Sequence, residues 1–294
     1  MARRTPSGAF ARTYDALLRS WPVQYEAQDV MTPYGTTRAI CSGPPDAPPL
    51  VLLPGAGATA LAWRNNVAAW STSHRVYAVD LLGDVGYSQP DGLPVRGLDD
   101  LCGWLAAVLD HTGEQPATLM GHSYGGWLAA SFALRHPGRL AQLILLDPAS
   151  VLTGLALRYR LRAVPALLLR RPASTRSFVH WETAGLDLDR QWLEVACAAA
   201  AQSVAPLVWP RRPAEPALST LTVPTLVIAA EHSRTSDAAE LVAAAQRLLP
   251  QVETQILGDT SHHSVPGGHA AVLNAVVADF LATAAPTASS MDER

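Results

Sequence analysis

Short apolar runs alternate with helix-length amphipathic segments along most of the chain. Six of the runs have the length of buried strands: residues 49–55, 75–83, 117–123, 143–148, 224–230 and 252–258. Apolar positions recur at helical spacing between them, most clearly at 98–113, 125–140 and 237–250. This alternation predicts an α/β fold with a mostly parallel central sheet flanked by helices. Right-handed crossovers would bring the carboxyl ends of the parallel strands to one edge, where such folds bind ligands.

Two segments depart from this alternation. Residues 24–43 have the pattern of an antiparallel hairpin that turns at Tyr34–Gly35. Residues 151–218 contain no clear strand but carry helical patterns of leucine, alanine and arginine, and they end in a proline-rich stretch. We expect residues 151–218 to form a helical cap or lid, inserted into a core made of residues 1–150 and 219–294.

Composition narrows the class of protein. A chain of 294 residues with 49% hydrophobic content and a net charge of −3 is typical of a soluble globular protein. That charge gives no reason to expect a nucleic acid or an anionic membrane as partner. The chain has neither a secretory signal pattern nor an apolar run of the roughly 18 residues needed to span a membrane, so we predict a cytoplasmic protein. The three cysteines form no metal-binding or disulfide pattern, and no metal or organic cofactor is implied.

The stretch Gly121-His122-Ser123-Tyr124-Gly125 matches the pattern G-x-S-x-G between a predicted strand and a predicted helix. A turn this sharp strains its central residue, and its flanking positions need glycine because strand and helix backbones approach them closely. The turn would lift the Ser123 hydroxyl clear of the sheet edge. It would also aim the amide of Tyr124, at the helix N-terminus, toward a developing oxyanion. We therefore predict that Ser123 is a nucleophile.

With this motif in that setting, the chain resembles the α/β-hydrolase fold family, in its serine-nucleophile, esterase-like branch with a helical cap. The resemblance covers residues 21–281. The stretch LLPGAGATALAW (52–63) resembles the family's oxyanion loop, although Pro54-Gly55 stands where the family has His-Gly. The resemblance implies that the Ala56 amide is the second oxyanion donor beside that of Tyr124. The stretch VDLLGDVGYS (79–88) is similar to a structural segment of the family.

A serine hydroxyl is a poor nucleophile near neutral pH and needs a base within hydrogen-bond reach. The family places this base, a histidine, after the last strand and ahead of the final helix. The corresponding segment here offers His262 and His263. The spacing in the family favours His262 as the base, with His263 lining the site or holding the loop. His269 is expected at the surface.

The acid that orients the histidine is less obvious. In the family it commonly follows the strand that here ends at residue 230, and that position falls on Ser233. A serine cannot offset the charge of an imidazolium, and loss of the acid costs other hydrolases about four orders of magnitude in turnover. Three carboxylates are candidates. We favour Asp147, at the end of another strand, over Asp237, which also fits a helix start, and over Glu231; a site with no carboxylate is a further possibility.

These features predict a serine hydrolase that cleaves a carboxylic ester, thioester or lactone through an acyl-enzyme, on a hydrophobic small molecule. Six arginines between Arg158 and Arg176, with no acidic residue among them, fit either a solvated helix face or a patch for an anionic substrate or an acyl carrier protein. Two other functions stay open because Ser233 and Pro54 depart from the family pattern. One is a cyclase or acyltransferase of natural-product biosynthesis, and the other is a catalytically decayed ligand-binding protein.

Overall fold

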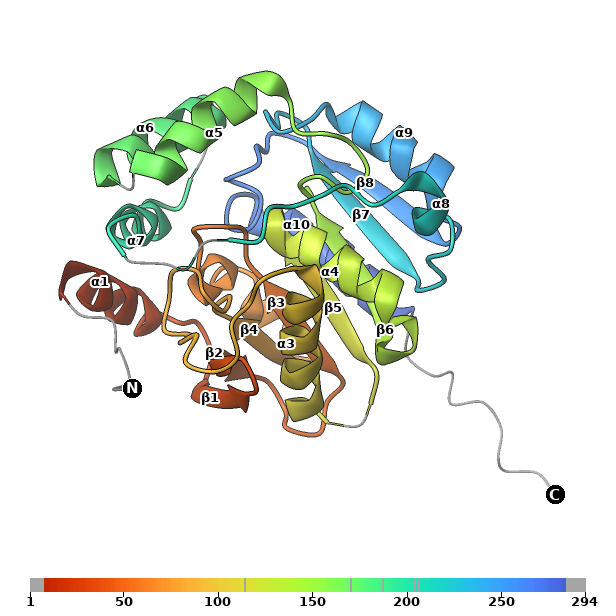
Figure 1. Ribbon diagram of the computed structural model, residues 1–294, viewed down its shortest axis with the longest axis horizontal. Coiled ribbons are helices and arrows are strands. Elements are labelled where there is room, and N and C mark those ends of the chain that lie inside the picture. The colour runs from red at the N-terminus through yellow and green to blue at the C-terminus, as the bar shows by residue number, and fades with distance from the viewer. Residues whose placement is uncertain are drawn as a thin grey trace.

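The computed structural model describes residues 8–113, 115–169, 171–186, 188–202, 205 and 207–283. Within these residues the chain forms one eight-stranded sheet in the order β1-β2-β4-β3-β5-β6-β7-β8 (Figure 1). The strands are β1 Glu26–Thr32, β2 Gly35–Ser42, β3 Pro49–Leu53, β4 Arg75–Val79, β5 Ala117–His122, β6 Leu140–Leu146, β7 Thr225–Ala230 and β8 Val252–Leu257. Strand β2 pairs antiparallel with β1 and β4, and the pairs from β4 to β8 are parallel. The predicted α/β fold is confirmed.

Helices cover both faces of the sheet. They are α1 Gly8–Leu18, α2 Val67–Trp70, α3 Leu98–His111, α4 Tyr124–Arg135, α9 Ala238–Leu248 and α10 Ala270–Ala282. In β3, Val51 and Leu53 pack on the side of α3, α4 and α9, whereas Leu50 and Leu52 pack on the side of α1, α2 and α10. Because successive side chains of a strand point to opposite faces, a strand covered on both sides needs an uninterrupted apolar run.

The first hairpin and helix α1 refine the sequence expectation. The hairpin turns at Pro33 and Tyr34, one residue earlier than expected, and Gly35 already pairs with Thr32. Helix α1 was not expected from the sequence. Its side chains Phe10 and Tyr14 are buried, and the Tyr14 hydroxyl donates a hydrogen bond to Asp80 at 3.2 Å.

The segment between β6 and β7 carries the helices α5 Leu157–Leu169, α6 Pro172–Thr183, α7 Arg190–Ala199 and α8 Glu215–Leu218. Helices α5, α6 and α7 stand apart from the sheet in Figure 1, and α1 packs against α7. Two side chains of helix α4 hold the segment that leads back to β7: Tyr124 donates to the carbonyl of Val208 and Trp127 to that of Arg211. The division into a cap of residues 151–218 and a core stays a prediction. The small and polar residues 285–294, whose sequence predicts a disordered tail, lie outside the described residues.

None of the described helices combines the length and the apolar content required to cross a membrane.

Candidate active site

Ser123 occupies the turn between β5 and α4. Its backbone has φ 53° and ψ −114°, a conformation that residues with a side chain rarely adopt and that costs about 1–3 kcal/mol. The two flanking glycines are a steric requirement. A Cβ added to Gly121 would collide with the carbonyl oxygen of Gly125, and one added to Gly125 would collide with the carbonyl oxygen of Leu53. The strained turn therefore depends on close contact among β5, α4 and β3.

A continuous chain of hydrogen bonds joins Ser123, His262 and Asp147. Ser123 Oγ lies 2.8 Å from His262 Nε2, and His262 Nδ1 lies 2.6 Å from Asp147 Oδ2. The Asp147 and His262 side chains are almost completely buried, with 0% and 2% of their surfaces exposed. A carboxylate accepts hydrogen bonds, so Nδ1 carries the proton and Nε2 presents its lone pair to the serine hydroxyl. This tautomer is the one that can remove the serine proton.

The three candidate acids lie in different places. Asp147 follows β6 and contacts His262, as described above. Asp237 is the N-cap of α9, where its carboxylate accepts the backbone N–H of Glu240 at 2.9 Å. Glu231 is exposed and accepts the backbone N–H of Asp259 at 3.0 Å. Of the three, only Asp147 forms a hydrogen bond with the His262 ring within the described part of the chain.

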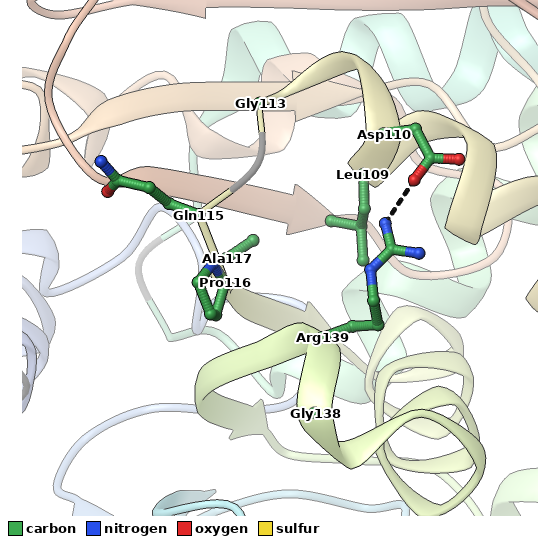
Figure 2. Close-up of a pocket in the computed structure, with 8 residues that line it drawn as sticks. All are labelled: Leu109, Asp110, Gly113, Gln115, Pro116, Ala117, Gly138 and Arg139. Carbon is green, nitrogen blue, oxygen red and sulfur yellow. Dashed lines mark hydrogen bonds and ion pairs between the residues drawn. The ribbon is translucent and has the colours of Figure 1, made fainter.

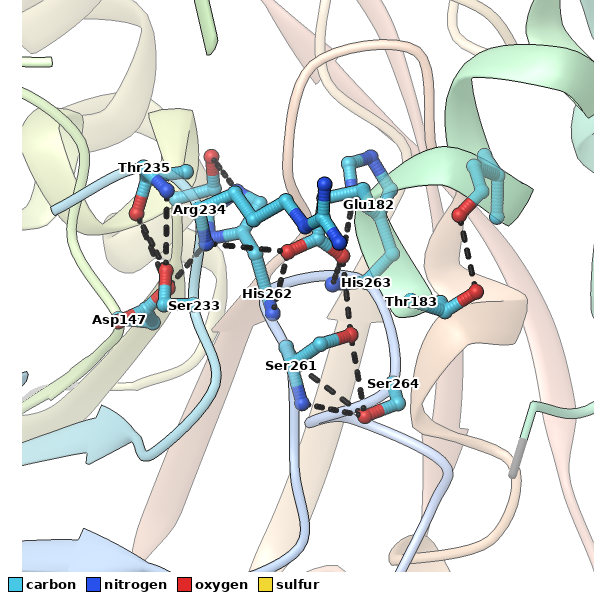
Figure 3. A network of polar contacts seen from close by, with 12 residues as sticks. Asp147, Glu182, Thr183, Ser233, Arg234, Thr235, Ser261, His262, His263 and Ser264 are labelled. Carbon is cyan, nitrogen blue, oxygen red and sulfur yellow. Dashed lines mark hydrogen bonds and ion pairs between the residues drawn. The ribbon is translucent and has the colours of Figure 1, made fainter. Parts of the chain in front are cut away.

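Ser233 is also part of this network. Its hydroxyl donates to Asp147 Oδ2 at 2.7 Å, and the Thr235 hydroxyl lies 3.3 Å from the same oxygen (Figure 3). The backbone N–H of Ala230 lies 3.4 Å from the other carboxylate oxygen. Ser233 therefore fills the usual acid position with a donor that supports a carboxylate supplied by the neighbouring strand. A buried carboxylate needs such partners, because an unpaired one is costly to desolvate.

The loop that follows β3 passes beside the serine. A Cβ added to Gly55 would lie 3.3 Å from Ser123 Cβ, so the next residue, Ala56, is close to the nucleophile. Asp84 fastens this loop by accepting the backbone N–H of Gly57 at 2.8 Å. On the other side, Tyr124 is the first residue of α4, where helix N–H groups have no partner within the helix. The two predicted oxyanion donors thus flank Ser123.

His122 has a role that the sequence analysis did not assign. Its Nε2 lies 2.9 Å from the carbonyl oxygen of His262, and this oxygen can only accept a hydrogen bond. Burial, together with the nearby His262 and His263, lowers the pKa of His122 well below its ordinary value. A neutral His122 with a proton on Nε2 therefore holds the backbone of His262 from the side of the sheet.

Glu182, near the end of α6, was missed by the sequence analysis. It is fully buried and contacts the loop after β8 through Ser261, His262 and His263 (Figure 3). One sequence signal was available, because Glu182 is the first carboxylate that follows Asp147 in the chain. A lone glutamate inside an amphipathic helix is normally solvated, however, so this signal alone does not indicate burial.

Aromatic rings of helices α5, α6 and α7 cover the histidine pair. Tyr159 of α5 packs edge-on against His262, with ring centroids 5.7 Å apart, and Phe178 of α6 packs edge-on against His263 at 5.2 Å. Trp192 of α7 lies 6.4 Å from His263. These rings give the site an apolar surface on the side of α5, α6 and α7.

A surface hollow of about 370 Å³ lies elsewhere, where α3 ends and β5 and β6 begin (Figure 2). It is crossed by an ion pair of 2.6 Å between Arg139 and Asp110. This hollow adjoins the amino end of β5, whereas Ser123 follows the carboxyl end. The candidate active site therefore lies at the opposite edge of the sheet.

Residues 50–276 match the family model described as Alpha/beta hydrolase family, which covers more than half of the chain. The chain belongs to the alpha/beta hydrolase family. Two proteins of Bacillus subtilis (strain 168) are relatives in sequence. The chain is 40% identical to an "Uncharacterized carboxylesterase nap" over 141 residues, 48% of this chain and 46% of that one. It is also 40% identical to "Carboxylesterase YbfK" over 140 residues, 48% of this chain and 47% of that one. These matches span about half the length of the curated relatives.

Two solved structures resemble the chain over nearly its whole length. Naproxen esterase (carboxylesterase NP) from Bacillus subtilis has a TM-score of 0.86 and 28% identity, over 93% of this chain and 97% of that one. Carboxylesterase CesB (YbfK), also from Bacillus subtilis, has a TM-score of 0.87 and 29% identity over the same shares.

Proposed function

We propose that this alpha/beta hydrolase is a serine carboxylesterase in which Ser123, His262 and Asp147 form the catalytic triad. The observation that carries this proposal is the hydrogen-bond chain from Ser123 Oγ through His262 to Asp147, with links of 2.8 and 2.6 Å. The relatives named as carboxylesterases support the choice of an ester as substrate. A carboxylate beside His262, in spite of the serine at position 233, supports an active enzyme over a decayed binding protein.

Acylation would begin when Ser123 Oγ attacks the carbonyl carbon of the ester while His262 Nε2 takes the hydroxyl proton. The negative oxygen of the tetrahedral intermediate would be held by the backbone amides of Ala56 and Tyr124. As the intermediate collapses, the bond to the alcohol breaks, and the imidazolium gives its proton to the leaving alkoxide. The products of this half-reaction are a free alcohol and an acyl ester of Ser123.

Deacylation would repeat these steps with water as the nucleophile. His262 takes a proton from water, the resulting tetrahedral intermediate expels Ser123 Oγ, and the proton returns to the serine. Asp147 accepts the hydrogen bond of His262 Nδ1 and stabilises the imidazolium in both halves, a contribution worth about four orders of magnitude in hydrolases of this type. Removal of water from the acyl-enzyme would instead favour transfer to an alcohol, the alternative raised by the sequence.

The substrate class we propose is an ester of a small molecule with an apolar acyl group, held beneath a cap of residues 151–218. Support comes from the rings of Tyr159, Phe178 and Trp192 over the histidine pair. On α5, the exposed Arg158 and Arg160 have no such contact with the histidine pair, and Arg162 packs over Trp181. An acyl carrier protein as partner, and a cytoplasmic location, stay predictions. Arg170 lies outside the described residues.

The test compares wild type with Ser123→Ala, using 4-nitrophenyl butyrate hydrolysis and labelling by a fluorophosphonate. Wild type should hydrolyse the ester and take up one label per chain. The variant should lose at least about 10⁴-fold in kcat and take up no label. Equal rates in both proteins would overturn the proposal. Adding a short alcohol to the wild-type reaction, with the butyrate ester of that alcohol measured, separates a hydrolase from an acyltransferase.

A further inference from the structure

The buried carboxylate of Glu182, on α6, accepts several hydrogen bonds from the loop that carries the catalytic histidine. Glu182 Oε1 accepts the backbone N–H of His262 at 3.1 Å, and Oε2 accepts the backbone N–H of His263 at 2.9 Å. Oε2 also accepts the Ser261 hydroxyl at 2.9 Å and lies 3.1 Å from His263 Nδ1. All four donors come from three consecutive residues, so the single side chain of Glu182 holds this part of the loop.

The same carboxylate reaches a second loop of the site. The backbone N–H of Arg234, next to Ser233, points to Glu182 Oε1 at 3.4 Å. The His262 backbone is thereby held from two sides, by Glu182 on its N–H and by His122 on its carbonyl oxygen. Its ring is fixed by Asp147 and Ser123. A displacement of about 1 Å at such a ring can cost a hundredfold in rate, so this restraint bears directly on turnover.

We propose that Glu182 is a positioning residue that couples the seated cap to His262, and that its negative charge favours the imidazolium formed during turnover. This inference rests on the proposed function, because it assigns His262 as the base. Glu182 acts through the histidine loop, by hydrogen bonds to the His262 backbone and by charge.

Within the described residues, the charged and titratable groups near Glu182 and His262 come from several elements. Asp147 faces the His262 ring from β6, His122 from β5 and Tyr159 from α5, while His263 shares its loop. The Arg234 guanidinium lies over the Trp181 ring, 4.7 Å from its centroid. Burial alone would raise the pKa of Glu182, but the hydrogen bonds and charges of His263 and His262 outweigh it and hold that pKa well below its usual range. Glu182 is therefore an anion wherever the esterase would be assayed.

If Glu182 acts through its negative charge, its removal changes the pH dependence of kcat/KM, whereas a Glu182 that only fills space does not affect it. The base must be neutral to act, so the acidic limb of kcat/KM follows the ionisation of His262. Removing a nearby anion makes the imidazolium less favourable, which moves this limb to lower pH and lowers kcat. A carboxylate that served packing alone would leave the limb where it is.

The experiment uses the full chain with Glu182→Gln, Glu182→Asp and the matched control Glu194→Gln. Glu194 is a cap carboxylate on α7 that pairs with Arg176 at the surface. Hydrolysis of 4-nitrophenyl butyrate is followed from pH 5 to 9, with rates referred to the fraction of chain that fluorophosphonate labels. For Glu182→Gln we expect a fall in kcat of about 10- to 100-fold, a KM within about threefold of wild type and an acidic limb at lower pH.

Glu182→Asp keeps the charge and loses reach, so its limb should stay at the wild-type pH while kcat falls by a smaller factor. Glu194→Gln should behave as wild type. A Glu182→Gln variant with the wild-type kcat and limb would overturn the proposal, and so would a loss of kcat with no movement of the limb. If Glu182→Gln does not fold, Glu182→Asp decides, and a wild-type kcat in that variant overturns the proposal. A wild type with no more activity than Ser123→Ala would instead refute the proposed function, and this inference would fall with it.

Discussion

Asp147 makes more contacts than any of the other candidate acids. It has a positive φ of 41°, is buried, and receives hydrogen bonds from His262 and Ser233. The carboxylate thus has its orientation set by a hydroxyl on one side and can set the orientation of the imidazole on the other. The carboxylate of Asp237 instead accepts a backbone N–H of its own helix, and that of Glu231 accepts the backbone N–H of Asp259, just after β8.

Replacing Asp147 with Asn should lower kcat for 4-nitrophenyl butyrate by about 10⁴-fold while the protein stays folded, because the amide no longer stabilises the imidazolium or its tautomer. The readout is steady-state kinetics with unfolding monitored by circular dichroism. Asp237→Asn is the matched control, since asparagine caps a helix about as well as aspartate, and it should keep wild-type turnover. A near-wild-type rate in Asp147→Asn would remove Asp147 from the triad.

The sequence predicts the parts of a site that depend on neighbouring residues better than those that depend on contacts between distant residues. Ser123 could be identified because its strain, its glycines and the flanking elements lie within a few residues. Asp147 could be favoured over Asp237 and Glu231, but the sequence could not show its contact with His262, because that contact joins residues 115 positions apart. Glu182 could not be found, since the contact that gives it a role spans 80 positions and depends on how α6 packs over the core. Such contacts depend on how distant elements pack together, and the periodicity of hydrophobic residues does not predict this packing.

At the scale of elements, the apolar runs located the strands from β3 to β7 because a strand buried on both faces needs continuous hydrophobic sequence. The run at 252–258 located β8 as well, although β8 is an edge strand with mostly exposed or half-buried side chains. The hairpin turn came out one residue early, within the usual uncertainty of element ends. Helix α1 has a weaker signal. Its buried Tyr14 is held through Asp80, a residue of the distant β4 end, so nothing near it in sequence indicates that it packs on the core.

The nucleophile turn should be intolerant of a single methyl group. Gly125→Ala would drive a Cβ into the backbone of β3, which cannot move as a flexible side chain can. We expect a loss of about 1–3 kcal/mol in the free energy of unfolding, measured in urea, and a fall in esterase rate as the turn is displaced. Gly138→Ala is the control, because a Cβ there meets no atom within 4 Å. Equal stability of the two variants would contradict a close-packed turn.

At the scale of the molecule, helices α6 and α7 are joined to the elements beneath them by polar contacts as well as by packing. Arg64, between β3 and α2, pairs with Asp189 at the start of α7 at 2.7 Å, and Glu182 of α6 binds the histidine loop. The Glu182 contact carries a pH dependence. Its pKa is depressed in the folded chain, so its contribution to stability is present above the ordinary glutamate pKa and is lost as pH falls through the depressed folded value.

The stability gap between wild type and Glu182→Gln should therefore be largest near neutral pH and shrink as the pH falls below about 4.5, the ordinary pKa of glutamate. Urea unfolding at a series of pH values from 7 to 3.5 measures this gap. Glu194→Gln removes an exposed carboxylate and should show almost no gap at any pH. A gap for Glu182→Gln that does not change with pH would contradict an ionised, hydrogen-bonded Glu182.

The two backbone N–H groups that donate to Glu182 offer a way to observe the motion of α6. Neither amide proton of His262 and His263 is held by its own loop; both are covered by a side chain of α6. Their exchange with deuterium requires that Glu182 leave these two groups, either alone or together with α6. The exchange rate of the two amides would therefore report how often this contact opens in solution, without substrate and without any label on α6 itself.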